Sequence, residues 1–180
     1  MAPLSFGQPD DGIIQIGYVV PELREAMRHW TDQLRVGPWF VVENFAGEDP
    51  TYRGVPAEAR CDIALGFAGH MQIELICQRD DKPSVYREMV AERGYGFHHF
   101  GVAAGDFEAE ARRLRAKGYV TAFTARVPSG GRVAYFDTRG AMPGMIELIE
   151  ADAGLDAMFG DMYRQSLGWA GEDPIRVMHP

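Results

Sequence analysis

The sequence predicts an α+β fold built from two βαβββ modules and a C-terminal helix. Stretches with strand and helix patterns follow the order strand–helix–strand–strand–strand twice along the chain. Short motifs recur at equivalent places: Gln-Ile-Gly at 15–17 matches His-Phe-Gly at 99–101, and Ile-Glu-Leu-Ile occurs at 73–76 and again at 146–149. An internal duplication of this kind predicts that both halves contribute equivalent positions to one shared site.

The first half begins with an apolar, β-branched strand over residues 13–20. Pro21 is tolerated in the first turn of a helix and is expected to open one that ends before Gly37 and Pro38. The apolar residues of that helix repeat at one-face spacing: Leu23, Ala26, Met27, Trp30 and Leu34. A strand over 39–45, a loop through 47–56, and a hairpin of strands 60–67 and 71–77 complete the module.

The second half follows a polar bridge with a short helix near 85–90. A strand is expected over 97–103, and Asp106 is a suitable N-cap for the helix that follows, with Gly118 as its C-terminal cap. A strand over 119–127 leads into a turn through Ser129, Gly130 and Gly131. The last two strands are expected over 132–137 and 145–150. We therefore divide one structural domain into module 12–78, linker 79–95, module 96–151 and a C-terminal helix and tail, 152–180.

The tail has apolar residues at helical spacing that belong to neither copy. They are Leu155, Met158, Phe159, Met162, Tyr163 and Leu167. The simpler interpretation is an extra helix that covers the sheet, and the functional alternative is a lid or wall for the site.

The composition excludes several classes of partner. The chain has 180 residues, 46% of them hydrophobic, and a formal net charge of −8 without a basic stripe. An acidic domain of this kind is a poor candidate for binding nucleic acid or an anionic membrane. With no apolar run of membrane-spanning length, no secretory signal at the N-terminus and only two cysteines, a cytoplasmic location is expected.

Four polar residues interrupt apolar strands at equivalent places in the two halves. Gln15 and His99 lie in the first strand of each half, and Glu74 and Glu147 lie in the last. A carboxylate buried in a strand core is costly without a partner, and a divalent cation would supply one for both. Strict alternation places His98 on the face opposite His99, where a structural core role is expected.

Four stretches resemble the vicinal-oxygen-chelate (glyoxalase-like) superfamily, over about residues 12–151. They are Ile-Gly-Tyr-Val-Val-Pro-Glu-Leu at 16–23, Gln-Ile-Glu-Leu-Ile at 72–76, Gly-Phe-His-His-Phe-Gly-Val at 96–102 and Gly-Met-Ile-Glu-Leu-Ile at 144–149. The resemblance implies an open, barrel-like mixed sheet around one cleft, and homodimers are typical of the family. It also implies metal ligands at Gln15, Glu74, His99 and Glu147. The first ligand is most often His, but the eukaryotic type of glyoxalase I is similar to this chain in using Gln, Glu, His and Glu.

Three oxygen donors and one nitrogen donor suit zinc, nickel, cobalt, iron(II) or manganese, with positions left open for substrate oxygens. The resemblance implies an isomerase, epimerase or lyase that transfers a proton α to a carbonyl of a small oxygenated substrate. Glu147 and Glu74 would be its catalytic carboxylates. Two alternatives remain: a non-catalytic binding or resistance protein of the same fold, and an extradiol dioxygenase, which typically uses two His ligands and one Glu.

Overall fold

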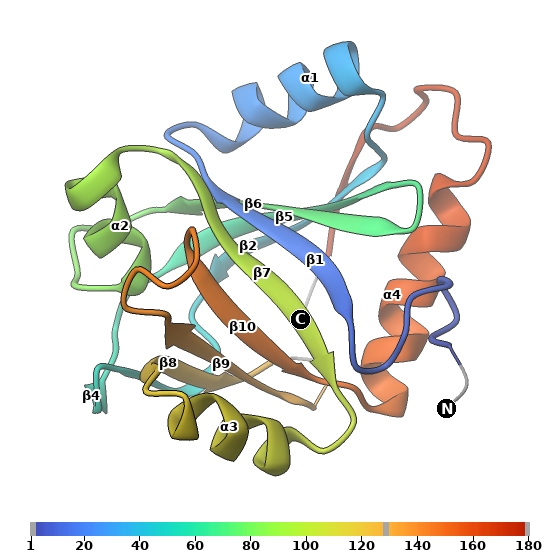
Figure 1. The fold of residues 1–180 in the computed structure, drawn as a ribbon. Helices are drawn as coiled ribbons and strands as arrows, with labels where there is room; N and C mark the ends of the chain where they lie inside the picture. Colours follow the sequence, from blue (N-terminus) through green and yellow to red (C-terminus); the bar gives the residue numbers. More distant parts are fainter. Residues whose placement is uncertain (1–2, 128–129, 179–180) are drawn as a thin grey trace.

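An open, eleven-stranded mixed sheet with four helices forms the described part of the chain, residues 3–127 and 130–178 of a computed structural model (Figure 1). The strand order is β11-β2-β5-β6-β1-β7-β10-β9-β8-β3-β4. The strands are β1 (Ile13–Val19), β2 (Trp39–Phe45), β3 (Glu48–Tyr52), β4 (Val55–Pro56), β5 (Cys61–Ala68), β6 (Met71–Gln78), β7 (Gly96–Ala104), β8 (Val120–Arg126), β9 (Arg132–Asp137), β10 (Met145–Glu150) and β11 (Ile175–Val177). The helices are α1 (Leu23–Leu34), α2 (Val85–Arg93), α3 (Phe107–Ala116) and α4 (Ala153–Ser166).

The same pairing pattern occurs in each half of the sheet. In the first half β1 runs parallel to β6, which continues antiparallel to β5 and then β2. In the second half β7 runs parallel to β10, which continues antiparallel to β9 and then β8. The antiparallel pair β1 and β7 joins the halves at the centre of the sheet (Figure 1). The predicted α+β class, with two βαβββ units in an open mixed sheet, is confirmed.

Helices α1 and α3 cover the outer face of the sheet. Leu23 and Met27 of α1 pack on β5 and β6, and Phe107 and Leu114 of α3 pack on the strands around β10. The predicted caps of α3 are present, since the Asp106 side chain accepts a hydrogen bond from Ala109 N at 2.9 Å and Gly118 has a φ of 86°.

The first helix differs from the prediction at both ends. It begins at Leu23 with Glu22 as its N-cap, so Pro21 precedes the helix instead of lying in its first turn. Leu34, expected on the buried face, is the last residue of the helix and is 61% exposed. Arg35 then ends the helix in a left-handed conformation.

The stretch predicted as a loop over 47–56 instead contains β3 and β4. Thr51 and Tyr52 pair with Thr124 and Phe123 of β8, which places this small hairpin at the edge of the sheet. Pro56 lies on the edge strand β4, and Pro50 lies where the register of β3 against β8 shifts; a missing N–H is tolerated at both kinds of place. This stretch therefore has the glycines and prolines of a turn and also pairs as strands. The sequence pattern predicted only the turn.

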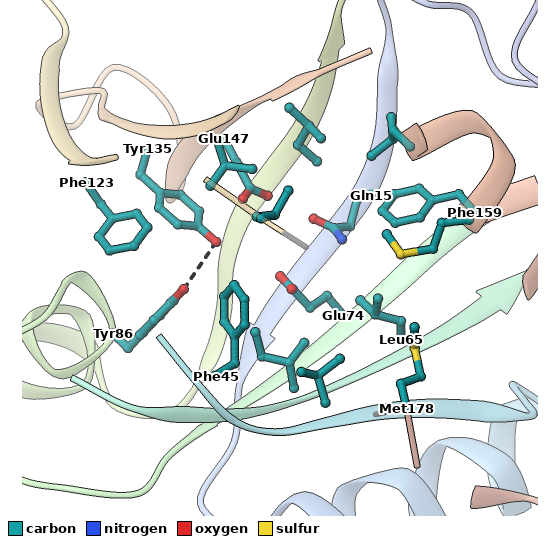
Figure 2. A pocket seen from close by; sticks show the side chains of 17 residues that line it. Gln15, Phe45, Leu65, Glu74, Tyr86, Phe123, Tyr135, Glu147, Phe159 and Met178 are labelled. Carbon is teal, nitrogen blue, oxygen red and sulfur yellow. Dashed lines mark hydrogen bonds between the residues drawn. The ribbon is translucent and has the colours of Figure 1, made fainter. Parts of the chain in front are cut away.

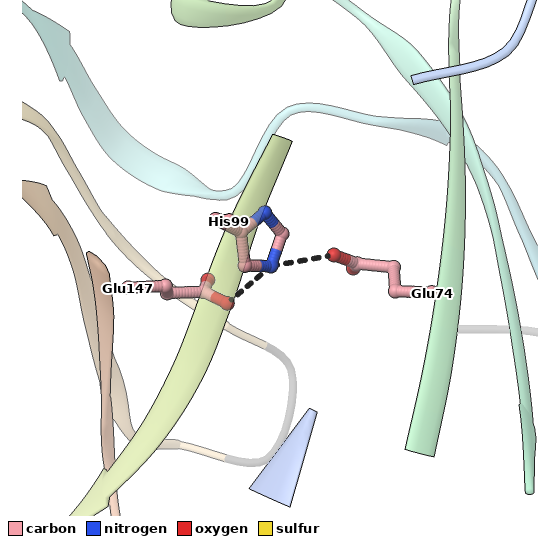
Figure 3. A group of neighbouring side chains, drawn as sticks. All are labelled: Glu74, His99 and Glu147. Atoms are coloured by element: carbon pink, nitrogen blue, oxygen red, sulfur yellow. Dashed lines mark ion pairs between the residues drawn. The ribbon is translucent and has the colours of Figure 1, made fainter. Parts of the chain in front are cut away.

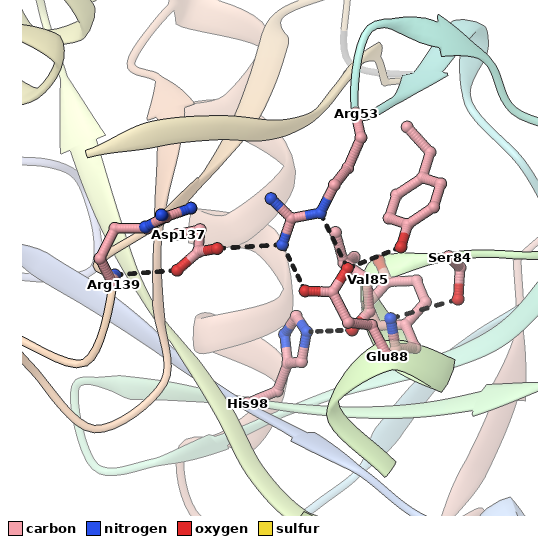
Figure 4. Close-up of polar contacts among 9 residues, drawn as sticks. Arg53, Ser84, Val85, Glu88, His98, Asp137 and Arg139 are labelled. Atoms are coloured by element: carbon pink, nitrogen blue, oxygen red, sulfur yellow. Dashed lines mark hydrogen bonds and ion pairs between the residues drawn. The ribbon is translucent and has the colours of Figure 1, made fainter. Parts of the chain in front are cut away.

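A polar cluster ties this hairpin to α2 and β9 (Figure 4). Arg53 binds both Glu88 and, at 2.9 Å, Asp137, and the Tyr52 hydroxyl donates to Glu88 at 2.6 Å. The hydrogen bond from Arg53 is the main reason that the pKa of Glu88 lies below its ordinary value. Ser84 caps α2 by accepting from the backbone N–H groups of Tyr86 and Arg87.

The C-terminal helix forms where the apolar spacing predicted it. Asp152 caps α4 by accepting from Leu155 N at 2.7 Å, and Leu155, Phe159 and Met162 are buried against the first-half strands. The segment after α4 returns to the sheet as β11, parallel to β2. Part of the predicted turn through Ser129 lies outside the described residues. Within the described ranges, no helix is long and apolar enough to cross a membrane.

Candidate metal centre

Four adjacent strands at the centre of the sheet bring together the four polar residues singled out in the sequence. Gln15 lies on β1, Glu74 on β6, His99 on β7 and Glu147 on β10, and all four side chains are buried. They project from the inner face of the sheet, away from α1 and α3. Equivalent strands of the two halves therefore supply equivalent members of one cluster.

The imidazole of His99 is the centre of this cluster (Figure 3). Its Nε2 lies 3.2 Å from Gln15 Oε1, 3.3 Å from Glu74 Oε2 and 3.1 Å from Glu147 Oε2. One ring nitrogen carries at most one proton, so it cannot donate to all three oxygens. Among the described residues, Glu74 Oε2 has no hydrogen bond of acceptable geometry although it is close to His99. The cluster is thus rich in acceptors and short of donors.

Protonation of His99 offsets part of the negative charge of the cluster when no cation is bound. Burial disfavours the imidazolium form of His99, but Glu147 and Glu74 outweigh it and raise the pKa of His99 to about 9. Burial raises the pKa of Glu74, and the nearby His99 opposes that rise. A divalent cation in place of the imidazolium proton would favour the ionised form of both carboxylates.

His98 does not lie on the predicted side of the sheet, because its side chain is on the same side as that of His99. The register of β1 against β7 shifts between Gly17 and Tyr18, which pair with His99 and Phe97, so His98 is the extra residue of a β-bulge. The two imidazoles then meet, with His98 Nδ1 at 3.0 Å from His99 Nδ1. The strict alternation used for the prediction fails at a bulge.

This contact fixes the arrangement of protons. His98 Nε2 lies 3.4 Å from the carbonyl oxygen of Val85, which can only accept a hydrogen bond (Figure 4). His98 therefore carries its proton on Nε2 and accepts at Nδ1 from His99 Nδ1–H. Because burial lowers the pKa of His98 well below its ordinary value, His98 stays neutral. His99 is then left with Nε2 directed at the three oxygens.

A second buried amide orients Gln15. The Nε2 of Gln15 donates a hydrogen bond to Gln72 Oε1 at 2.7 Å, and Gln72 is completely buried. With the amide nitrogen engaged there, the Gln15 oxygen points toward His99 and the carboxylates. An amide that presents its oxygen matches the other acceptors of the cluster.

Two glycines provide the space for these side chains. Gly17 pairs with His99 and Gly101 with Gln15 across the central strands. A Cβ added at Gly17 would lie 1.9 Å from His99 Cε1, and one at Gly101 would lie 2.8 Å from Gln15 Cβ. The glycines therefore permit the close approach of both first-strand residues.

The cluster opens into a mainly apolar cavity of about 140 Å³ (Figure 2). Gln15, Glu74 and Glu147 lie on its wall, and the remaining lining residues are mostly aliphatic or aromatic. Leu155, Met158 and Phe159 of α4 and Met178 line one side. The tail thus both covers the sheet and forms a wall of the cavity.

Two tyrosines add the other polar atoms of the wall. Tyr86 comes from α2 and Tyr135 from β9, and the Tyr86 hydroxyl donates to that of Tyr135 at 3.4 Å (Figure 2). Burial raises the pKa of each phenol well above its ordinary value, so both remain protonated. Neither tyrosine was singled out in the sequence. Tyr135 pairs with Glu147 in the register of β9 against β10, and the sequence does not give this register because a loop separates the two strands.

Comparison with protein families gives one match, over residues 14–136, to the Glyoxalase/Bleomycin resistance protein/Dioxygenase superfamily. This match covers more than half of the chain. None of the curated proteins compared with the chain matches it.

Solved structures share the fold at low sequence identity. A hypothetical protein from Bacillus halodurans C-125 has 19% identity and a TM-score of 0.58, with 79% of this chain and 95% of that chain covered. Methylmalonyl-CoA epimerase from Mycobacterium tuberculosis has 23% identity and a TM-score of 0.55, with 81% and 91% covered. A variant of the Streptomyces coelicolor methylmalonyl-CoA epimerase in complex with 2-nitronate-propionyl-CoA has 18% identity and a TM-score of 0.52, with 79% and 99% covered. At these identities the likeness concerns the fold alone.

Proposed function

Because the chain belongs to the glyoxalase/bleomycin resistance protein/dioxygenase superfamily, we propose that it is a metal-dependent isomerase, epimerase or lyase. The reaction would transfer a proton at the carbon next to a carbonyl group of a small oxygenated substrate. The observation that carries this proposal is the buried cluster in which three oxygen acceptors surround one imidazole nitrogen.

The cluster fits a divalent cation. Glu74 Oε2 is buried without a hydrogen bond in the described chain, and only one proton is available for three acceptors. Gln15 Oε1, Glu74, His99 Nε2 and Glu147 would hold the ion, with two negative charges against its two positive ones. When bound, the ion supplies Lewis-acid polarisation of substrate oxygens.

The carboxylates would move the proton. Glu147 lies on the cavity wall, so its carboxylate can take a proton from a carbon of a molecule bound there. Glu74 lies on the same wall but on β6, in the other half of the sheet. Two carboxylates from opposite halves can remove a proton from one face of a carbon and return a proton to the other face. An epimerase requires this arrangement. His98 and Gln72 act as positioning residues because they orient His99 and Gln15.

The decisive experiment measures exchange of the α-proton of small α-hydroxyketones in deuterated water by NMR. Wild-type protein loaded with metal is expected to catalyse exchange, and Glu147→Gln should lose at least about a hundredfold in rate, the low end for a general base. Glu150→Gln, on the same strand but bound to Arg132, serves as the control. Comparable exchange by wild type and Glu147→Gln would refute the role of Glu147 and move the chemistry to Glu74.

A non-catalytic binding protein is the second candidate, and the apolar lining of the cavity favours it. Such a protein would bind hydrophobic compounds without proton exchange, so the same NMR experiment separates the two. The dioxygenase alternative is weaker, because His98 directs its Nδ1 at His99, and among the described residues only one imidazole faces the carboxylates.

A further inference from the structure

The cavity wall consists of a few polar groups and a larger apolar surface. Its polar groups are Gln15 and the two carboxylates of the cluster and the two phenol hydroxyls, and no lysine or arginine lines it among the described residues. The other lining side chains are apolar: Val42, Phe45, Ile63, Leu65, Phe123, Val127, Val133, Ile149, Leu155, Met158, Phe159 and Met178. A wall of this kind favours an uncharged, hydrophobic body, and apart from the proposed metal ion it offers no cation for a phosphate or carboxylate.

The size of the cavity limits that body to about one ring. Its volume is about 140 Å³, and an apolar protein cavity of about 150 Å³ is known to accommodate benzene. The tail contributes to this limit because Leu155 and Phe159 of α4 close one side. A large group attached to the ring, such as coenzyme A, would have to remain outside the cavity.

Tyr135 is placed to contact the oxygenated end of such a molecule. It pairs directly with Glu147 in the register of β9 against β10, so the two side chains share one face of the sheet. Its hydroxyl accepts from Tyr86 across 3.4 Å, long compared with about 2.8 Å for a usual O–H···O bond. No residue of the described chain accepts the proton of Tyr135, so this proton is available to an acceptor in the cavity.

We propose that the substrate is an uncharged, single-ring compound with vicinal hydroxyl and carbonyl oxygens, and that Tyr135 donates a hydrogen bond to one of these oxygens. This inference rests on the proposed function and specifies its substrate class. The apolar lining holds the ring, and the oxygens lie between Tyr135 and the carboxylate cluster. The same wall disfavours a substrate that places a carboxylate inside the cavity, as a methylmalonyl group would, because apart from the proposed metal ion it offers only apolar side chains, carboxylates, an amide and phenols.

The test compares 2-hydroxycyclohexanone with methylmalonyl-CoA by isothermal titration of the metal-loaded protein. The hydroxyketone is expected to bind at least about tenfold more tightly. Tyr135→Phe should weaken its binding about three- to tenfold, as expected for one neutral hydrogen bond. Tyr163→Phe is the matched control, since Tyr163 packs on Phe67 and His70 and does not line the cavity.

Val42→Phe provides an independent test that does not depend on the phenol. It adds a ring to the cavity wall and should abolish binding of the hydroxyketone while metal content stays at the wild-type level. If Tyr135→Phe fails to fold, this variant decides whether the ring occupies the cavity.

Tighter binding of methylmalonyl-CoA, or wild-type affinity in Val42→Phe or in folded Tyr135→Phe, overturns the inference. Exchange of the methylmalonyl-CoA α-proton in that case would still support the proposed reaction. Conversely, cavity binding of the hydroxyketone without exchange of any α-proton supports the substrate class and refutes the proposed reaction.

Discussion

Replacing Gly17 with alanine tests whether the spacing between β1 and β7 holds the metal centre in place. The added Cβ would lie 1.9 Å from His99 Cε1 and 2.5 Å from its Nε2. Carbon atoms in contact are separated by about 3.5–4.0 Å, so the ring must move by roughly 1.5 Å. Functional constellations tolerate only about 0.5 Å, so the displaced Nε2 should no longer act with the three oxygens.

We expect two separate effects of Gly17→Ala. Overpacking should lower the free energy of unfolding by about 1–3 kcal/mol, which corresponds to roughly 2–12 °C in melting temperature for a chain of this length. Affinity for a divalent ion should fall further, by about 100-fold or more, because His99 is displaced from the cluster. Thermal unfolding monitored by circular dichroism and titration with Zn²⁺ measure the two effects.

Two other glycines complete the experiment. Gly101→Ala brings a Cβ to 2.8 Å from Gln15 Cβ and should have a smaller effect on both quantities. Gly105→Ala is the control, because the added Cβ finds its nearest neighbours at 4.0 Å, an ordinary contact. Wild-type zinc affinity in folded Gly17→Ala would refute the claim that close approach of His99 and β1 sets the site.

Three further perturbations test the parts that support the site. His98→Phe removes the acceptor for His99 Nδ1–H and should weaken zinc binding about 10–100-fold. His29→Phe, at an exposed position, is the control. Equal zinc affinities of wild type and His98→Phe would show that His98 does not position His99. Phe159→Ala removes a side chain that is 4% exposed on α4 and should cost about 3–5 kcal/mol in urea unfolding, and a cost below about 1 kcal/mol would contradict its place in the core. The Arg53 hydrogen bond lowers the pKa of Glu88, so its stabilisation is full above the unfolded pKa of about 4.3 and is lost as the pH falls through the folded pKa. The stability difference between wild type and Arg53→Met should therefore shrink below about pH 4, and a constant difference from pH 7 to pH 3 would refute this linkage.

The repeated motifs were sufficient to predict the duplicated sheet and the strands that carry the four polar residues. The strands β1, β6, β7 and β10 were recognisable as apolar runs because most of their residues are buried or partly buried on both faces of the sheet. The glycine two residues after Gln15 and after His99 was also visible. Its purpose became clear only from the register, which places each glycine opposite the other half's polar residue.

Features that depend on local irregularity or on long-range pairing were missed or misplaced. The bulge that turns His98 toward His99 breaks the two-residue period without changing composition. The β3–β4 hairpin has the prolines and glycines of a loop, and its pairing with β8 joins residues about 70 positions apart. Tyr86 and Tyr135 approach each other only after α2 and β9 have packed on the same cavity.

Metal binding by the central cluster is tested most directly by counting the ions bound to wild-type protein and to Glu147→Gln. The apoprotein is equilibrated with Zn²⁺, and bound metal is measured by elemental analysis, with Glu150→Gln as the control on the same strand. We expect one ion per chain in wild type and in Glu150→Gln, and an affinity at least about tenfold weaker in folded Glu147→Gln. A wild-type protein that binds no divalent ion, or a Glu147→Gln variant that binds it as tightly as wild type, would show that the central cluster is not a metal site with Glu147 as a ligand.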